Sequence, residues 1–107
     1  MTDILIVDDE RSMREFLEIF CKKEGWRVRT APGVEAALDL LDEREPNLVI
    51  TDLKMKGPGG IELLRAVKQR NPSVEVIVIT AFATDATAMD AIKSGAYDYI
   101  HKPFHVD

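Results

Sequence analysis

The sequence has few of the features that define several large classes of protein. Its 107 residues include one cysteine, Cys21, so the chain cannot form an internal disulfide. It contains no apolar run near the roughly 18 residues of a membrane-spanning helix, and its first residues have no basic segment typical of a secretory signal. Lys and Arg total 14 against 19 acidic residues, a net charge of −5, whereas binding DNA phosphates requires clustered positive charge. We therefore expect a cytoplasmic domain that contacts neither membrane nor nucleic acid.

The composition is that of an ordinary folded domain. Hydrophobic residues make up 46% of the chain and charged residues 31%, and the length suits one domain rather than two. Short apolar runs, typical of buried strands, occur at residues 4–7, around Val28, and at 48–50, 74–79 and 97–100. Arg27 and Arg29 flank Val28, a pattern that predicts an edge strand with solvated charges.

The segments between these runs have apolar residues at intervals of three or four, the period of a helix that buries one face. These stripes are Met13, Phe16, Leu17, Phe20 and Cys21; Val34, Ala37, Leu38 and Leu41; Ile61, Leu64 and Val67; and Met89 and Ile92. Cys21 is therefore expected to be a buried structural thiol. The alternation of strands and helices predicts an α/β fold, a doubly wound five-stranded parallel sheet with helices on both faces.

Polar side chains follow four of the five predicted strands. Asp8 and Asp9 end the first strand, Asp52 the third, Thr80 the fourth and Lys102 the fifth. Each alone is an ordinary turn, helix-cap or surface residue. Because the carboxyl ends of parallel strands meet at one edge of the sheet, where such folds bind ligands, we expect all five residues to form one site.

The three predicted neighbouring carboxylates suit a hard divalent cation, and Mg²⁺ prefers such oxygen ligands. A carboxylate beside bound Mg²⁺ can act as a nucleophile toward a phosphoryl group. In this interpretation Lys102 supplies a second positive charge and Thr80 a hydroxyl donor for the phosphoryl oxygens. The residues thus predict magnesium-dependent phosphoryl transfer without a Walker loop, which the sequence lacks.

Four motifs in this order resemble the receiver domain of two-component response regulators: "VDDE" at 7–10, "TDLKM" at 51–55, "ITAF" at 79–82 and "YDYIHKPF" at 97–104. The resemblance extends over residues 4–104, and the wording of residues 80–104 is similar to the nitrogen-regulation class of transcriptional activators. It implies the flavodoxin-like fold with strand order 2-1-3-4-5. It also implies a sensor histidine kinase as the phosphoryl donor and control of an output, with transcription favoured.

The resemblance implies a role for each matching residue. Asp52 would be the phospho-acceptor and a metal ligand; Asp9 would bind Mg²⁺ directly, Asp8 mainly through water, and Lys54 through its backbone carbonyl. Thr80 would move to bond a phosphoryl oxygen, and Lys102, with a cis bond to Pro103, would pair with the phosphate. Tyr99 would rotate inward as Thr80 moves. This change would reshape the surface of the fourth helix and fifth strand, through which a homodimer is possible.

The sequence departs from the usual receiver pattern at two places. Glycines surround Pro58 at positions 57, 59 and 60, which suggests a mobile loop beside the acceptor. The chain also ends at Asp107, where a typical receiver continues into a fifth helix. We therefore expect residues 1–107 to be the N-terminal receiver fragment of a longer regulator, or else to have an apolar patch near the fourth and fifth strands that dimerises.

Other residues and functions remain open at this point. The bulk of Phe82 and Lys54 predicts a long-lived phosphate, because both would hinder attack by water. We do not expect His101 or His105 to bind a metal. One alternative is a stand-alone receiver that acts by protein contact; another is a magnesium-dependent phosphohydrolase, although position 54 is Lys where a second catalytic carboxylate is needed. A flavin-binding module would need a Ser/Thr/Gly-rich loop in place of "DDERSMR". We favour a switch that catalyses only its own phosphorylation and dephosphorylation.

Overall fold

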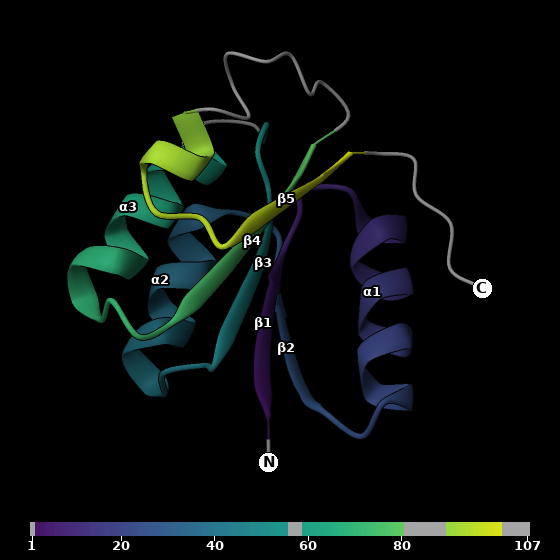
Figure 1. Ribbon diagram of the computed structural model, residues 1–107. Coiled ribbons are helices and arrows are strands. Elements are labelled where there is room, and N and C mark those ends of the chain that lie inside the picture. The colour runs from purple at the N-terminus through teal and green to yellow at the C-terminus, as the bar shows by residue number, and fades with distance from the viewer. Residues whose placement is uncertain (1, 56–58, 81–89, 102–107) are drawn as a thin grey trace.

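The computed structural model describes residues 2–55, 59–80 and 90–101, with the backbone alone at residue 80 and over 98–101. Strands and helices alternate along the chain (Figure 1). The elements are β1 (Asp3–Val7), α1 (Arg11–Lys23), β2 (Arg27–Ala31), α2 (Val34–Glu43), β3 (Leu48–Asp52), α3 (Gly60–Arg70), β4 (Glu75–Thr80) and β5 (Asp98–His101). Residues 90–93, before β5, are also helical.

The strands form one five-stranded sheet in the order β2-β1-β3-β4-β5, and every neighbouring pair is parallel. This confirms the predicted fold and strand order. The strand β1 pairs with β2 on one side and β3 on the other, and all five of its residues are buried. A strand covered on both faces requires the continuous apolar sequence seen here.

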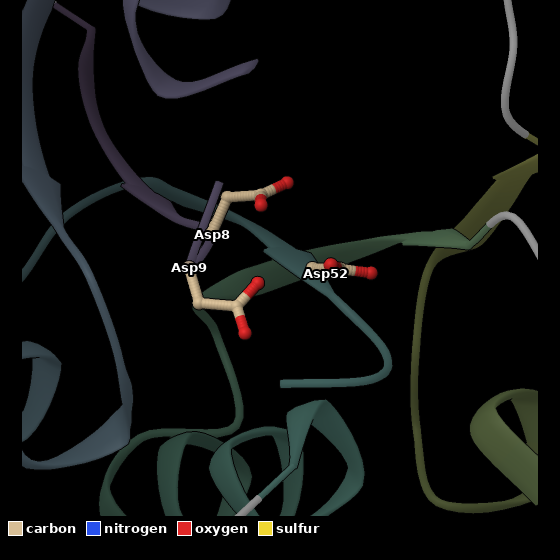
Figure 2. Close-up of side chains that lie close together, drawn as sticks. All are labelled: Asp8, Asp9 and Asp52. Atoms are coloured by element: carbon tan, nitrogen blue, oxygen red, sulfur yellow. The ribbon is translucent and has the colours of Figure 1, made fainter. Parts of the chain in front are cut away.

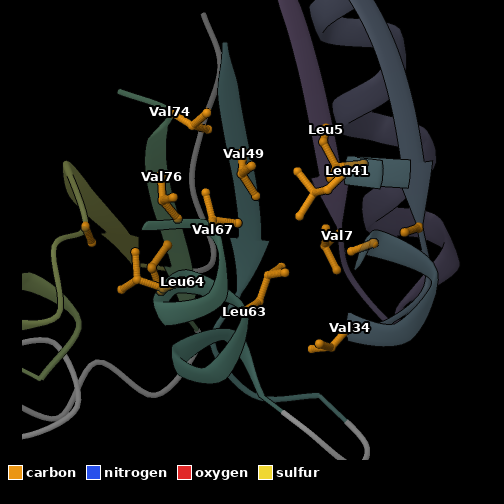
Figure 3. Close-up of a cluster of buried hydrophobic side chains, with 14 of the residues drawn as sticks. Leu5, Val7, Val34, Leu41, Val49, Leu63, Leu64, Val67, Val74 and Val76 are labelled. Carbon is orange, nitrogen blue, oxygen red and sulfur yellow. The ribbon is translucent and has the colours of Figure 1, made fainter. Parts of the chain in front are cut away.

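Helices cover both faces of the sheet, as predicted. In Figure 1, α1 lies on one face and α2 and α3 lie on the other. Alternate residues of β1 divide between the two layers. Leu5 and Val7 join the larger core cluster beneath α2 and α3, part of which is shown in Figure 3. Ile4 and Ile6 pack with the α1 side chains in a smaller cluster.

Cys21 lies in the smaller cluster and is 2% exposed, which confirms the predicted buried thiol. Burial raises the pKa of this thiol because it disfavours the thiolate, and the negative charge of Glu24 raises the pKa further. Both effects keep the sulfur in its unreactive protonated form at neutral pH.

Two predicted core positions are wrong. Phe16 is 43% exposed, because the buried line of α1 runs through Leu17 and Cys21 and the residue before Leu17 points about 100° away around the helix. Ile92 is 40% exposed, and its neighbour Ala91 is buried in its place. The predicted inward position of Met89 lies outside the described residues.

The two faces of the sheet are covered to different extents. Val49 and Val76 are fully buried under α2 and α3, whereas Ile50 and Ile77, their neighbours on the α1 face, are only half-buried. Within the described ranges, α1 is the one helix on this face. None of the helices described in the structure has the length and apolar character required to span a bilayer.

Candidate functional site

The pairing of β1 with β3 brings the predicted carboxylates together. The two strands are parallel, and Val7 at the end of β1 lies opposite Thr51 in β3. The residues that follow β1 therefore lie beside Asp52, the last residue of β3. Figure 2 shows Asp8, Asp9 and Asp52 side by side at this edge of the sheet.

Each of these three residues contributes a carboxylate oxygen to a cluster in which all the contributing atoms lie within 4.8 Å of one another. Asp8 is 1% exposed and Asp52 is 8% exposed, whereas Asp9 is exposed to solvent. Carboxylate oxygens gathered this closely are the ligands that a hard divalent cation prefers, so the donor set fits Mg²⁺.

The main chain and the carboxylate of Asp8 are held by hydrogen bonds. Its N–H donates to the carbonyl of Ala31 at the end of β2 (3.2 Å). Its Oδ1 accepts the N–H of Glu10 (2.8 Å), and its carbonyl oxygen accepts a hydrogen bond from Arg14 Nη1 (2.7 Å). Hydrogen bonds to β2, to Glu10 and to Arg14 of α1 therefore hold the turn between β1 and α1 in place.

The main chain around Asp52 is also held closely. Thr51 is fully buried, and its Oγ1 donates to the carbonyl oxygen of Asp52 (3.0 Å). The next residue, Leu53, donates its N–H to Ile79 in β4 (2.9 Å) and accepts the N–H of Gly60 (2.9 Å). These bonds join the end of β3 to both β4 and the start of α3.

The prediction of a mobile loop at the glycines that follow Asp52 is wrong in part. Gly60 is not part of a mobile loop; it is the buried first residue of α3. A Cβ at this position would lie 2.3 Å from the carbonyl oxygen of Asp52, so only glycine allows α3 to approach so closely. Gly59 also lies near the backbone of Leu53, while Gly57 and Pro58 lie outside the described residues.

The other predicted site residues are placed in part. Lys54 is exposed, and its N–H lies 3.4 Å from Asp52 Oδ1. The backbone of Thr80 ends β4, which lies next to β3, and the backbone of Tyr99 lies in β5. The side chains of Thr80 and Tyr99 lie outside the described part of the chain, as do Lys102, Phe82 and His105.

Sequence reasoning missed Arg14 and Thr51. The apolar stripe of the first predicted helix does not include Arg14, which is a charged residue beside that stripe. Its position four residues after Glu10, on the first turn after the acidic motif, was the one available signal. Thr51 looked like an ordinary strand residue, and no pattern in the sequence shows that its hydroxyl contacts the Asp52 carbonyl.

Comparison with known proteins decides the family. Residues 4–107 match the model of the response regulator receiver domain. The chain belongs to this family. A putative NtrX-like response regulator of Rickettsia felis is 42% identical to this receiver over 107 residues, which are 98% of the chain and 22% of the relative. The receiver spans less than a quarter of the length of the first curated relatives that it matches.

Solved structures agree with this family and fold. NtrX from Brucella abortus in complex with ADP superimposes with a TM-score of 0.92 at 38% identity, over 98% of this receiver and 24% of that chain. A CheY-like receiver domain protein from Methanospirillum hungatei gives a TM-score of 0.93 at 28% identity, over 98% and 84% of the two chains. This receiver is thus a two-component signalling domain whose relatives include regulators of the NtrX and NtrC class.

Proposed function

We propose that this receiver is a magnesium-dependent switch that accepts a phosphoryl group on Asp52 from a sensor histidine kinase. The observation that supports this function is the cluster of three carboxylates at the ends of β1 and β3, in which Asp52 is almost buried. We further propose that residues 1–107 are the N-terminal, cytoplasmic part of a longer regulator that controls transcription. A stand-alone receiver that acts by protein contact is the alternative.

The residues proposed to hold Mg²⁺ are Asp9 directly, Asp8 mainly through water, Asp52, and the backbone carbonyl of Lys54. The exposure of Asp9 beside two buried carboxylates leaves one side of the cluster facing solvent, from which an ion and a donor can approach. When bound, the ion neutralises negative charge on the transferring phosphoryl group and on the carboxylates around it.

In the proposed transfer, a carboxylate oxygen of Asp52 bonds to phosphorus as the bond from phosphorus to the donor nitrogen breaks, which leaves an aspartyl phosphate. Asp52 needs a fixed main chain for in-line attack, and the contacts from Thr51 and Gly60 provide it. Lys102 is proposed to pair with the phosphoryl oxygens, and Thr80 to donate its hydroxyl to one of them.

In the proposed switch, Thr80 moves toward the phosphate and Tyr99 then rotates. The backbone of β4 pairs directly with that of β5, so the two residues lie on neighbouring strands. The surface that would change comprises the helical residues 90–93, β5 and the segment between them. Ile92 and Tyr97 in this part of the chain are exposed apolar residues, and we propose that a homodimer forms through this surface.

Intact-mass spectrometry after incubation with acetyl phosphate tests this function. The parent chain is expected to gain one phosphoryl group in the presence of Mg²⁺ and almost none in EDTA. The matched variant Asp52→Asn keeps the shape of the side chain and is expected to gain none. Labelling of Asp52→Asn equal to that of the parent, or repeated turnover of phosphomonoesters as in a phosphohydrolase, would contradict the proposal.

A further inference from the structure

We propose that Arg14 is a positioning residue of the cation site: it fixes the turn that presents the Asp8 and Asp9 carboxylates. This inference rests on the proposed function, because it concerns how that site binds Mg²⁺. In this proposal, a helix side chain outside the carboxylate cluster contributes to the affinity of the site for Mg²⁺.

Arg14 lies in the first turn of α1, and its side chain extends back toward β1. Its N–H donates to the carbonyl of Glu10 (3.1 Å), which begins the helix. Its guanidinium is partly buried and donates through Nη1 to the carbonyl oxygen of Asp8 at 2.7 Å. A short hydrogen bond from a charged donor is about twice as strong as one between neutral groups.

The bonded carbonyl belongs to the peptide group that joins Asp8 to Asp9. Holding this oxygen fixes the plane of the peptide group, because peptide groups are rigid, and so fixes the position of the Asp9 Cα from which that side chain extends. The Glu10 N–H holds Oδ1 of Asp8 at the same time. Of these contacts, the one from Arg14 comes from a side chain that can be exchanged without altering any carboxylate.

Positioning and simple electrostatics predict opposite effects. The guanidinium is a positive charge close to a site for a cation, so its charge alone opposes Mg²⁺ binding, and removing it should tighten binding. If Arg14 instead holds the carboxylates in place, removing it should weaken binding. Partners of metal ligands typically contribute about 10- to 100-fold to affinity. The direction of the change therefore separates the two roles.

The test is an NMR titration with MgCl₂ that follows the backbone amides of the whole chain, comparing the parent with Arg14→Met. Arg11→Met is the matched control: Arg11 is on the same helix turn and carries the same charge, but its side chain is exposed and pairs with Glu15. We expect Arg14→Met to weaken Mg²⁺ binding about tenfold or more, and Arg11→Met to leave it unchanged or slightly tighter. Arg14→Gln is a second neutral variant expected to behave as Arg14→Met.

The amide spectrum without Mg²⁺ shows whether each variant is folded, and thermal unfolding without Mg²⁺ measures any purely structural loss. Unchanged or tighter Mg²⁺ binding by the folded Arg14 variants would overturn the inference while leaving the proposed function intact. Equal weakening in Arg11→Met would also overturn it, because the effect would then not depend on the Asp8 contact. Failure of the parent chain to bind Mg²⁺ would overturn the proposed function and this inference together.

Discussion

At the scale of single residues, an ion-pair network surrounds the buried Asp3 at the end of the sheet opposite the carboxylate cluster. Asp3 is 6% exposed, and its two carboxylate oxygens contact Arg29 Nη2 (3.4 Å) and Arg44 Nε (2.7 Å). Arg29 also donates to the carbonyls of Leu40 (2.7 Å) and Arg44 (2.8 Å) at the end of α2. The prediction that the charge of Arg29 is solvated is therefore wrong, because this side chain connects β2 to β1 and to the end of α2.

Arg29→Met is expected to lower the free energy of unfolding by about 2–4 kcal/mol, because it removes one partner of a buried carboxylate and the donor to two helix carbonyls. Arg27→Met is the matched control, since Arg27 is exposed on the same strand, and it should cost less than about 0.5 kcal/mol. Urea denaturation monitored by circular dichroism measures both values. Equal stability of the two variants would show that the network contributes nothing.

At the scale of elements, the described helices begin without side-chain caps. The N-cap residues are Glu10 for α1, Gly33 for α2 and Gly59 for α3, and none of them caps a backbone N–H of its helix through a side chain. The helix starts depend instead on packing against the sheet, as the close contact of Gly60 with Asp52 shows. A side chain that caps one of these helices should therefore increase the stability of the protein where there is space for it.

Gly33→Asp is expected to stabilise the protein by about 0.5–1 kcal/mol, since it supplies a cap, places a negative charge at the helix start and restricts the unfolded chain. Position 33 has extended backbone (φ −172°), and a Cβ there meets nothing within 4 Å. The control is Gly59→Asp, whose Cβ would lie 3.0 Å from the Leu53 carbonyl oxygen, so no gain is expected. The midpoint of urea denaturation measures the effect of each substitution. Equal gains in stability at both positions would contradict this account.

The sequence predicted the elements well because β1, β3 and β4 contain short apolar runs and the helices α1, α2 and α3 have apolar stripes. It also placed Asp8, Asp9 and Asp52 at one edge, since parallel strands bring their carboxyl ends together. It failed at Arg29 and Arg14, whose partners are backbone carbonyls of distant or preceding elements. Such contacts depend on the packing of helices on the sheet, and a single residue type does not reveal them.

At the scale of the whole molecule, the carboxylate cluster and the ion-pair network lie at opposite ends of the parallel strands. Asp3 begins β1, and Asp8 and Asp9 follow its end. Figure 1 likewise shows the N-terminus at the far end of the sheet from the ends of β3 and β4. Distant sites contribute additively to stability, so substitutions in the network should leave the carboxylate cluster unaffected.

Phosphorylation is expected to cause self-association through the face that carries Ile92 and Tyr97, because both are exposed apolar residues next to the proposed switch. In sedimentation velocity with acetyl phosphate and Mg²⁺, the parent chain should shift from monomer toward dimer, and Ile92→Glu should remain monomeric. Ile19→Glu is the control, since Ile19 is 68% exposed on α1, and it should dimerise as the parent does. Dimerisation of labelled Ile92→Glu would exclude this face.

The most direct test of the central claim is to locate the phosphoryl group chemically. Borohydride reduces an aspartyl phosphate to homoserine, so the chain labelled with acetyl phosphate and Mg²⁺ can be reduced, digested and sequenced by tandem mass spectrometry. We predict homoserine at position 52 and at neither position 8 nor position 9, with none when Mg²⁺ is withheld. Homoserine at Asp8 or Asp9, or an unmodified Asp52 in a chain that has gained a phosphoryl group, would contradict the account.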